Sequence, residues 1–524
     1  MQAIPFKRQI LAGFLGIILF LGIVSYVVNV SVNHDESMYI GASFLSGSGL
    51  ALYHDFSYVQ MPDLPLFYGI FYRLVGVSYY LLATRLINTF FALLSGWAIY
   101  KITWTLSKDI LVSWSAVVLL EFNEMIIYIM GKASNDIMPL SFGILGFYFF
   151  VISFSEQVRP LAFFAAGICL AVATGIKLYY IVIVFPFIGI SIVYPKSLGL
   201  QERLLKVVFP LLAGLFVGFI PVLYYFFKDL EAFWINNWEY HSLNTKWREL
   251  TGYRQTMSFN SKLEFGEKIL GRSTNIILVN LIVFMIAIKS LDGLTIKKIL
   301  SQKLKSTEPS PELILSSSLF AIAVVTTLLP TPLWTQYFAF PIPFAILVII
   351  CLYIQLNTKG KIIAKRVLIF LTALTLIFGI GNNRLYNRFN TLLAPSKWKV
   401  VAVHRTAQNI RKYVKVVQSP DLNPKIATLA PLYAIEGGLE IYNELSAGPF
   451  MYRVGDLMSA EKRMKVKGTS IKTIQSLLDR DPPAAILVGF EGDLDSPLIE
   501  YAVENKYTKV KEKFNGGVLY VRRG

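Results

Sequence analysis

Two adjacent carboxylates, Asp35 and Glu36, follow directly after the first long apolar segment of the chain. That segment, residues 9–32, is long enough to cross a bilayer, which takes about 20 residues. Charge at the edge of the lipid is costly, so its presence there favours a functional role over ordinary loop polarity. A carboxylate so placed can accept a proton from an attacking hydroxyl or amine. We therefore expect Asp35 to act as a base and Glu36 to act with it or orient it.

Further polar residues map to the same side of the predicted membrane. Asp136 lies in the stretch GKASNDIMP, and Lys177 follows the end of a later apolar segment. A cation can hold a phosphate and stabilise the charge of a phosphate leaving group. Carboxylates and cations gathered in one pocket would suit the transfer of a group from a lipid phosphate to an acceptor. The other residues expected to line that pocket are His54, Lys132, Asn135, Gln336 and Tyr337.

Structural roles stay open for several of these residues. Asn135 and Asp136 would also serve as the N-cap of the apolar helix that follows them. Lys177 could simply extend its ammonium to the lipid headgroups. His34 and His54 could join carboxylates around a divalent metal, although no tight ligand spacing supports this. The chain has no P-loop, GxGxxG or HExxH motif, so no other cofactor is predicted.

The composition excludes a water-soluble globule. The chain has 524 residues, of which 55% are hydrophobic, and its mean hydropathy is +0.54. Its net charge is +17, and the basic residues lie between the apolar segments. We therefore interpret them as a signal of membrane topology and not of nucleic-acid binding. Cys169 and Cys351 both lie in apolar segments and predict neither a CxxC metal site nor a disulfide.

Eleven apolar segments predict a polytopic α-helical protein of the cell membrane. Basic residues fall between alternate segments, beginning with Lys7 and Arg8, and acidic residues such as Asp35 and Asp136 fall on the other side. The first segment is too long for a signal-peptide core and is expected to stay uncleaved. An odd number of segments places the end of the chain outside. The segments are roughly 9–32, 79–100, 110–130, 137–154, 160–175, 178–194, 207–227, 274–289, 312–329, 337–355 and 366–381.

Two outer loops are long, and the composition changes after about residue 382. The loop 33–78 has helical spacing that predicts two amphipathic helices on the membrane surface. The loop 228–273 is rich in Trp and Tyr and reads as an interfacial loop or a mobile lid. The strand-like stretches KIATLA, AAILVGF and GGVLYVRR, with helix-like stretches around them, predict a small extracytoplasmic α/β domain over 382–524. Residues 1–381 would form the membrane domain.

The first outer loop resembles that of the polyprenyl-phosphate-sugar-dependent glycosyltransferases. These are membrane enzymes of the GT-C fold, related to protein O-mannosyltransferases and to the lipid A aminoarabinose transferase. The resemblance continues through Asn135-Asp136, Lys177 and the stretch TPLWTQYFAFPIPFAIL, and it covers roughly residues 9–381. In the first loop it is carried by Asp35-Glu36, Tyr39, Ala42, Gly49, Tyr53, Asp55-Phe56, Pro62 and Pro65-Leu66.

The resemblance implies roles for particular residues. Asp35 matches the acidic residue assigned to acceptor activation, Glu36 matches its partner, and Asp136 resembles a second acidic residue that lines the same cavity. Lys177 and Tyr337 resemble positions that approach the carrier phosphate.

One departure from the family pattern concerns the phosphate. Several relatives have a Lys before the first-loop prolines, where this chain has Met61-Pro62-Asp63. Phosphate binding would then depend on other cations. The candidates are Arg85, Lys132 and Lys177.

The sequence thus favours an inverting glycosyltransferase. It would take a sugar from an undecaprenyl- or similar polyprenyl-phosphate donor and deliver it to a glycan, lipid or protein acceptor outside the membrane. The alternative is a transporter or flippase for a lipid-linked or anionic solute, which should show paired discontinuous helices in two related halves. A scaffold that only displays the C-terminal domain would leave the acidic pair at the membrane edge without a purpose.

Overall fold

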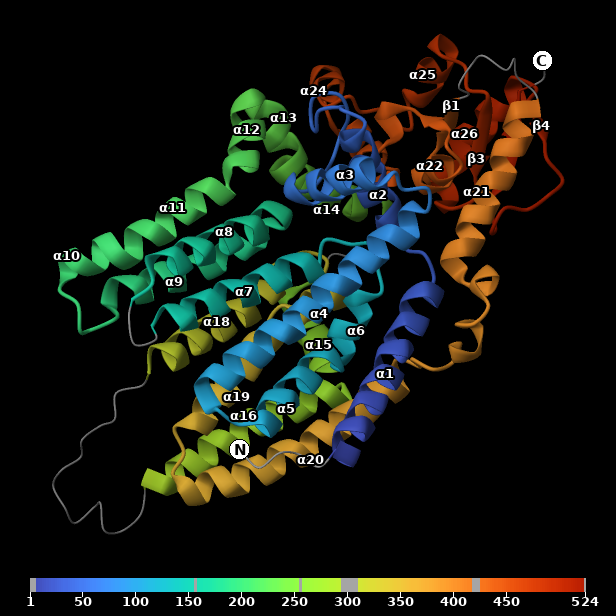
Figure 1. Cartoon of the computed structure of the whole chain (residues 1–524). Helices are drawn as coiled ribbons and strands as arrows, with labels where there is room; N and C mark the ends of the chain where they lie inside the picture. Colours follow the sequence, from blue (N-terminus) through green and yellow to red (C-terminus); the bar gives the residue numbers. More distant parts are fainter. Residues whose placement is uncertain (1–5, 155–157, 254–256, 294–309, 417–424, 523–524) are drawn as a thin grey trace.

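Apolar helices form the lower part of the molecule in Figure 1, and the C-terminal sheet lies at the upper end. The computed structural model describes residues 6–154, 158–253, 257–293, 310–416 and 425–522. The helices of the lower part are α1 (Phe6–Asn29), α4 (Tyr80–Ser107), α5 (Ile110–Glu121), α6 (Glu124–Met130), α7 (Ile137–Ser153), α8 (Pro160–Ile176), α9 (Ile181–Val193), α10 (Leu200–Arg203), α11 (Phe209–Gly218), α16 (Ser273–Gly293), α18 (Pro311–Leu328), α19 (Ile342–Ile354) and α20 (Thr358–Asn382). From the end of α11, the apolar helix α12 (Ile220–Lys228) rises to the upper end.

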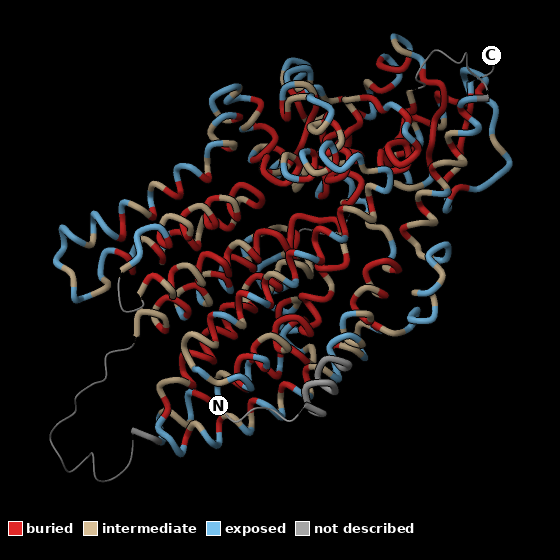
Figure 2. The backbone as a smooth tube through the Cα atoms, viewed as in Figure 1, coloured by how far each residue is buried: buried red, intermediate tan, exposed pale blue. Residues whose placement is uncertain are grey.

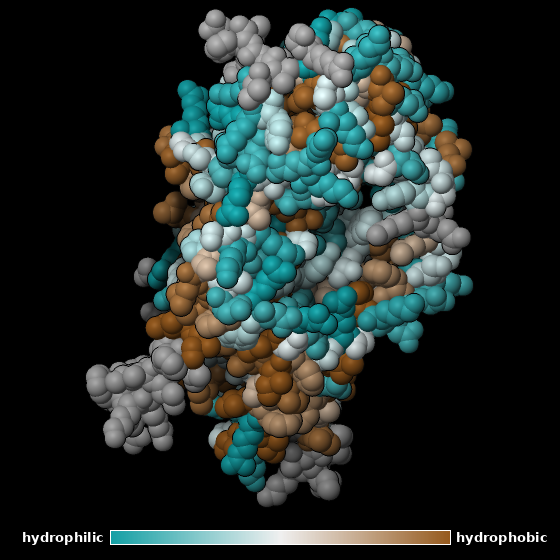
Figure 3. Space-filling model, turned by 90° about the vertical axis from the view of Figure 1, so that its right-hand side faces the viewer, coloured by the Kyte–Doolittle hydropathy of each residue, from teal (hydrophilic) through white to brown (hydrophobic). Residues whose placement is uncertain are grey.

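Each of the eleven predicted apolar segments lies on one of these helices or on a bent pair of them. In the described part of the chain, five helices are long and apolar enough to cross a membrane, or up to eight if each bent pair counts as one span. Three further apolar helices are shorter. Figure 3 shows hydrophobic side chains over the helical part of one face and hydrophilic ones above it. The protein is a multi-pass membrane protein, and eleven crossings stay a prediction.

Close backbone packing fixes α8 between α7 and α11. A Cβ atom added at Gly214 of α11 would lie 2.0 Å from the carbonyl oxygen of Phe164, and one at Gly167 of α8 would lie 2.2 Å from that of Leu211. Glycine is needed at both places because any side chain would push the two helices apart, as at other small-residue contacts of membrane helices. The packing fixes the end of α8 at Ile176, directly before Lys177.

The outer loops are helical. The axis turns by 86° between α1 and α2 (His34–Gly47), so α2 runs across the end of the bundle, and α3 (Asp63–Val75) follows it. Both helices predicted for the loop 33–78 are therefore present. The loop 228–273 holds a run of helices, which are α13 (Leu230–Trp234), the π-helix η3 (Ile235–Glu239), α14 (Tyr240–Thr251) and α15 (Phe259–Leu270). Of these, α13 lies above the bundle and α15 lies among the bundle helices (Figure 1).

The C-terminal part is a five-stranded mixed sheet with helices around it, in the order β2-β1-β3-β5-β4. Strand β1 pairs in parallel with β2 and β3, and β5 pairs antiparallel with β3 and β4. All three predicted strands are present, and β2 and β4 are short additions. The elements are α21 (Lys399–Val416), β1 (Lys425–Thr428), α22 (Pro431–Glu436), β2 (Glu440–Ile441), α23 (Pro449–Val454), α24 (Ala460–Lys465), α25 (Ile474–Arg480), β3 (Ala485–Val488), α26 (Ser496–Glu504), β4 (Thr508–Lys509) and β5 (Val518–Val521).

This sheet domain docks directly on the outer helices. A Cβ atom added at Gly41 of α2 would lie 2.9 Å from the carbonyl oxygen of Ser446, so the two backbones nearly touch. The Glu436 carboxylate accepts a hydrogen bond from the amide of Leu81 at 2.7 Å. One hydrophobic cluster includes residues of α2, α3, α21 and the sheet. Figure 2 shows that buried backbone continues from the helical part into the C-terminal domain. The C-terminal domain therefore forms one wall of any site at this end of α2.

Candidate active site between the bundle and the C-terminal domain

Asp35 lies in the first turn of α2, and local capping sets its position. The Asn33 side chain accepts a hydrogen bond from the amide of Asp35 at 3.3 Å, and Glu36 returns a carboxylate oxygen to the amide of Asn33 at 2.9 Å. This is a capping box, which fixes the start of a helix. The Asp35 side chain is 28% exposed and lies 3.1 Å from Nε2 of His34. It is an accessible carboxylate on a rigid helix end.

Glu36 points the other way and is fully buried against Arg85 of α4. The guanidinium donates to both carboxylate oxygens at 2.8 Å, and both side chains are 0% exposed. Arg85 also donates to the carbonyls of Val27 and Val30, and Glu36 accepts from the amide of Ala133 at 2.7 Å. The pair joins the ends of α1, α2 and α4 to the loop before Asp136. In this arrangement Arg85 faces Glu36 and not a phosphate, and Glu36 has the surroundings of a positioning residue.

Asp136 and Lys177 form a second ion pair, with side chains 10% and 9% exposed. Ser134 donates a hydrogen bond to the other Asp136 oxygen at 2.8 Å. The Lys177 ammonium also lies 5.1 Å from the ring centre of Tyr179 and 5.4 Å from that of Tyr337. The structure therefore brings together three of the residues predicted from the sequence. The Asp136 side chain makes no cap hydrogen bond to α7, so the N-cap alternative does not account for it.

Buried tyrosines lie beside Asp35. Burial raises the pKa of Tyr39 and that of Tyr240, and the Asp35 carboxylate adds to the rise at both. Two arginines reach the same region: Arg453 donates to the Tyr240 hydroxyl at 3.1 Å, and Arg248 lies 5.6 Å from the ring centre of Trp334. Both arginines are buried, at 6% and 4% exposure.

Sequence reasoning missed both arginines. Arg248 lies in the loop 228–273, whose many Trp and Tyr residues predict a lid or an interfacial loop. That aromatic composition is the feature of the sequence that could have pointed to Arg248. Arg453 belongs to α23 of the C-terminal domain, and only the folding of that domain over α2 brings it to the site.

Glu491 is a third residue that the sequence did not single out. Its carboxylate lies 3.8 Å from Nδ1 of His34, whose other ring nitrogen faces Asp35. Burial raises the pKa of Glu491 to about 7, and His34 opposes that rise. The hydrogen bond with Asp35 is the largest cause of the raised pKa of His34. His34 thus connects the candidate base to the C-terminal domain.

The remaining predicted residues are spread around this centre. The Lys132 ammonium lies 3.7 Å from the ring centre of Tyr128, and Asn135 donates to the Gln60 side chain at 3.3 Å. Gln336 is half-buried beside Tyr337. His54 pairs with Asp55 at 2.8 Å, away from His34, so the two histidines do not come together. No group of three or more metal-ligating side chains gathers within the described residues.

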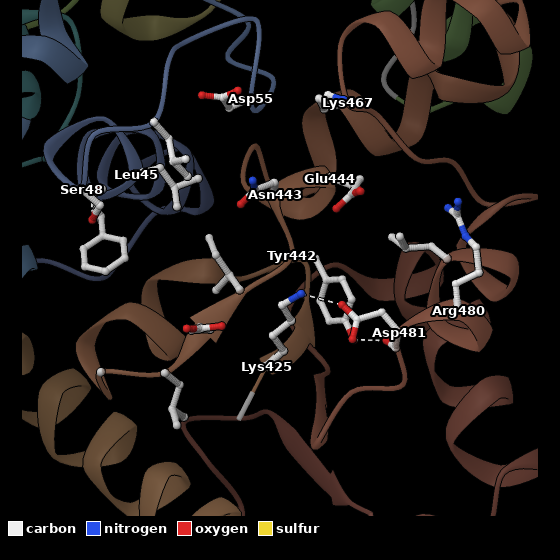
Figure 4. A pocket seen from close by; sticks show the side chains of 17 residues that line it. Leu45, Ser48, Asp55, Lys425, Tyr442, Asn443, Glu444, Lys467, Arg480 and Asp481 are labelled. Carbon is white, nitrogen blue, oxygen red and sulfur yellow. Dashed lines mark hydrogen bonds and ion pairs between the residues drawn. The ribbon is translucent and has the colours of Figure 1, made fainter. Parts of the chain in front are cut away.

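A cavity of about 900 Å³ separates α2 from the amino-terminal ends of β1 and β2. We call it the α2 cavity, and Figure 4 shows its lining side chains, among them Leu45, Lys425, Lys467 and Asp481. Lys425 pairs with Asp481 at 2.5 Å, and the Tyr442 hydroxyl donates to the Asp481 carbonyl. Because Asp35, Asp136 and Lys177 are not part of the lining, this cavity is not the candidate active site.

Comparison with known proteins identifies the architecture. No protein-family model and no curated protein sequence matches the chain. Two crystal structures of ArnT from Cupriavidus metallidurans do match it. The apo state has a TM-score of 0.63 at 12% identity, and the form bound to undecaprenyl phosphate has a TM-score of 0.63 at 13% identity; each alignment covers 98% of both chains.

The chain has the GT-C fold. The fold predicted from the resemblance of the first outer loop is therefore confirmed over nearly the whole length. The Archaeoglobus fulgidus oligosaccharyltransferase also aligns, with 11% identity over 96% of this chain and 73% of that one, but its TM-score of 0.44 is too low to carry weight.

Proposed function

We propose that the protein is a membrane glycosyltransferase that moves a sugar from a polyprenyl-phosphate donor to an acceptor on the outer side of the membrane. One observation carries the proposal: at one end of a GT-C bundle, the accessible carboxylate of Asp35 and the Asp136–Lys177 pair both act on the buried Tyr337, and Asp35 and Arg453 both act on the buried Tyr240. A base next to cations is what group transfer from a lipid phosphate requires. The ArnT structure with bound undecaprenyl phosphate supports a donor of this class.

The donor phosphate would bind between Lys177, Arg248 of the loop 228–273 and Arg453 of the C-terminal domain. Lys177 brings one ammonium, and Arg453 and Arg248 bring guanidinium groups that suit phosphate oxygens. Tyr337 stands against Lys177 and would orient it. Arg85 leaves this set because Glu36 and two carbonyls occupy its guanidinium.

The reaction would be a single displacement at the anomeric carbon. The acceptor hydroxyl or amine loses its proton to Asp35 as its oxygen or nitrogen bonds to C1 of the sugar. The bond from C1 to the phosphate oxygen breaks, and the electron pair leaves with the polyprenyl phosphate. The cations stabilise that phosphate as its charge grows. Attack from the side opposite the phosphate inverts the anomeric centre.

The test is transfer by purified protein in nanodiscs. A panel of radiolabelled undecaprenyl-phosphate sugars is incubated with the protein and with a membrane extract, and the labelled product is isolated. The matched pair of variants is Asp35→Asn and Asp55→Asn, which change the same group at two places in one loop. We expect Asp35→Asn to lose about 10²–10⁴-fold in turnover, the usual cost of removing a general base.

Asp55→Asn is expected to transfer at a rate near that of the unchanged protein, because Asp55 pairs with His54 outside the site. Undecaprenyl phosphate should still bind to Asp35→Asn, since the substitution keeps the volume of the side chain. Full turnover in Asp35→Asn would overturn the proposed role of this carboxylate. Absence of transfer with every donor would overturn the proposed activity.

A further inference from the structure

A second cavity opens beside His34, and Lys177 is not among its lining residues. Its volume is about 840 Å³, and we call it the His34 cleft. Its walls come from the outer ends of α1 and α6, from α21, and from the loops that follow β1 and β3; the residues used below are His34, Lys132, Lys399, Tyr433, Phe490 and Glu491. His34 separates this cleft from Asp35, whose carboxylate lies 3.1 Å from the ring. A ligand in the cleft would therefore lie next to the candidate base.

The topology of the sheet places the cleft where α/β sheets bind ligands. The chain leaves β1 toward α22 and β2 on one side, and it leaves β3 toward α26 and β4 on the other. The two loops diverge at the carboxyl ends of neighbouring parallel strands, which is a topological switch point. Tyr433 follows the first of these strands, and Phe490 and Glu491 follow the second. The α2 cavity, by contrast, lies at the amino ends of the strands.

The loop after β3 is held rigidly. The Asp495 carboxylate, 2% exposed, accepts hydrogen bonds from the amides of Gly489, Phe490 and Glu491 at 2.8–3.0 Å. The Phe490 ring stacks on that of Tyr433, with centroids 4.7 Å apart and planes 23° apart. An aromatic face attracts the weakly positive C–H bonds of a sugar ring. The cleft thus has a preformed platform for a sugar in the half-buried Phe490 ring, which the buried Tyr433 supports from behind, and the Glu491 carboxyl lies beside it to bind hydroxyl groups.

Two lysines give the cleft a positive wall. Lys132 stands over the Tyr128 ring, and Lys399 donates to the Ser31 hydroxyl at 2.7 Å. Neither ammonium has a carboxylate within salt-bridge distance among the described residues, whereas Lys177 does. Partial burial is the main cause that lowers the pKa of Lys399, and the charges of Arg388 and Arg85 add to it. Such a pair is suited to an anion, and phosphate is the anion that ammonium groups commonly bind.

We propose that the His34 cleft is the acceptor site and that it takes a phosphate-bearing sugar, with the sugar on Phe490 and the phosphate on Lys132 and Lys399. The role of the bound sugar as an acceptor rests on the proposed transferase function. The binding of a phosphate-bearing sugar in the cleft does not depend on that function. The acceptor could be free or lipid-anchored, because the outer ends of α1 and α6 form one wall of the cleft. The donor would occupy the Lys177 side of Asp35, so the two substrates meet at that carboxylate.

The test measures binding without any donor present. Full-length protein in phosphatidylcholine nanodiscs is titrated with glucose 1-phosphate by calorimetry. In a second arm, native mass spectrometry counts phosphatidylinositol retained in competition with phosphatidylcholine. The variants are the double substitution Lys132→Gln with Lys399→Gln, the charge-keeping double substitution to Arg, and Phe490→Leu. Lys467→Gln in the α2 cavity is the matched control, because it removes an equal charge from the other cavity.

We expect the double Gln variant to lose affinity at least about tenfold, as for the loss of one charge-assisted hydrogen bond. The Arg variant should recover most of that loss, Phe490→Leu should bind more weakly, and Lys467→Gln should be unchanged. Binding of glucose 1-phosphate alone indicates a free acceptor, and retention of phosphatidylinositol alone indicates a lipid-anchored one. Binding in neither arm, or equal binding in all variants, overturns the proposal.

A separate measurement distinguishes this site from the donor site. Undecaprenyl phosphate is offered to the same variants, and we expect the double Gln variant to retain it. Loss of undecaprenyl phosphate with glucose 1-phosphate binding kept would assign the cleft to the donor and overturn the inference. Lysine-dependent binding of glucose 1-phosphate, together with absence of transfer from every donor, would instead leave the ligand class supported and refute the transferase function.

Discussion

At the scale of single residues, Lys177 is paired with Asp136 and is also the proposed ligand of the donor phosphate. The phosphate must therefore share or replace the contact with Asp136. We predict that Lys177→Ala raises the apparent KM for the lipid-linked donor about tenfold or more, because a charge-assisted hydrogen bond is lost. The KM for the acceptor should change less. Lys177→Arg should rescue in part, since the charge stays and its shape differs.

Steady-state kinetics with each substrate varied in turn checks this prediction. Lys268→Ala, an exposed lysine on α15, is the control and should behave like the unchanged protein. If the KM for the donor does not change in Lys177→Ala, Lys177 does not bind the donor phosphate and its role is structural.

Glu36 offers a contrasting prediction, in stability. Glu36→Gln leaves the Arg85 guanidinium buried without its counter-charge, and breaking a buried pair in this way typically costs about 3–5 kcal/mol. We expect thermal unfolding in detergent to shift to clearly lower temperature. The double substitution Glu36→Gln with Arg85→Met should regain part of the loss, because no lone charge stays buried. A Glu36→Gln variant as stable as the unchanged protein but inactive would instead make Glu36 a chemical participant.

Glu491 predicts a pH dependence of stability. Its pKa is raised by burial from 4.5 to about 7, so the folded protein holds this proton after the unfolded chain has lost it. The free energy of unfolding should therefore fall as the pH rises from about 4.5 to 7. Glu491→Gln should flatten this part of the curve and raise stability above pH 7. Thermal unfolding between pH 4.5 and 8 measures it, and parallel curves for the two proteins would contradict it.

At the scale of elements, the contact of α8 with α11 determines where Lys177 stands. Gly214→Ala would force a methyl group against the Phe164 carbonyl, and overpacking of this kind costs about 1–3 kcal/mol. We predict a lower unfolding temperature and, because α8 must shift, a weaker apparent affinity for the donor. Gly189→Ala on α9, where nothing lies within 4 Å of the added atom, should change neither measurement. Equal stability of the two variants would show that the helices part without cost.

Most helices and strands could be predicted from the sequence. The bends between helices and the side-chain pairs between distant elements could not. Hydropathy alone located the apolar segments, because a span of about 20 apolar residues is a local property. The 62° bend between α5 and α6 and the 52° bend between α11 and α12 have no such local signature in their hydropathy. The Glu36–Arg85 pair joins residues 49 positions apart. Position at the membrane edge predicted a functional role for both Asp35 and Glu36. Only the folded contacts show that Asp35 is accessible and that Glu36 is buried against Arg85.

At the scale of the whole molecule, the C-terminal domain is part of the site. Composition predicted a small α/β domain, and its strands are present, but no local pattern predicted that it would dock on α2. Docking depends on surface complementarity between distant segments, as in the approach of Gly41 to Ser446. Arg453 and Glu491 were missed for this reason. If the domain forms a wall of the site, both must lie on the same side of the membrane.

The last prediction concerns that side. Basic residues between alternate segments and an odd number of segments predict that the C-terminal domain and Asp35 lie on the extracytoplasmic side of the membrane. The chain suits cysteine labelling, because its two natural thiols, Cys169 and Cys351, are buried. Lys509→Cys, exposed on β4, should react with a membrane-impermeant maleimide in intact cells. Gln201→Cys, exposed on α10 at the opposite end of the bundle, should react only after the cells are permeabilised. The reverse pattern would put Asp35 in the cytoplasm and exclude an outer acceptor. Labelling of both positions in intact cells would mean that the chain adopts two orientations, which a single outer active site does not allow.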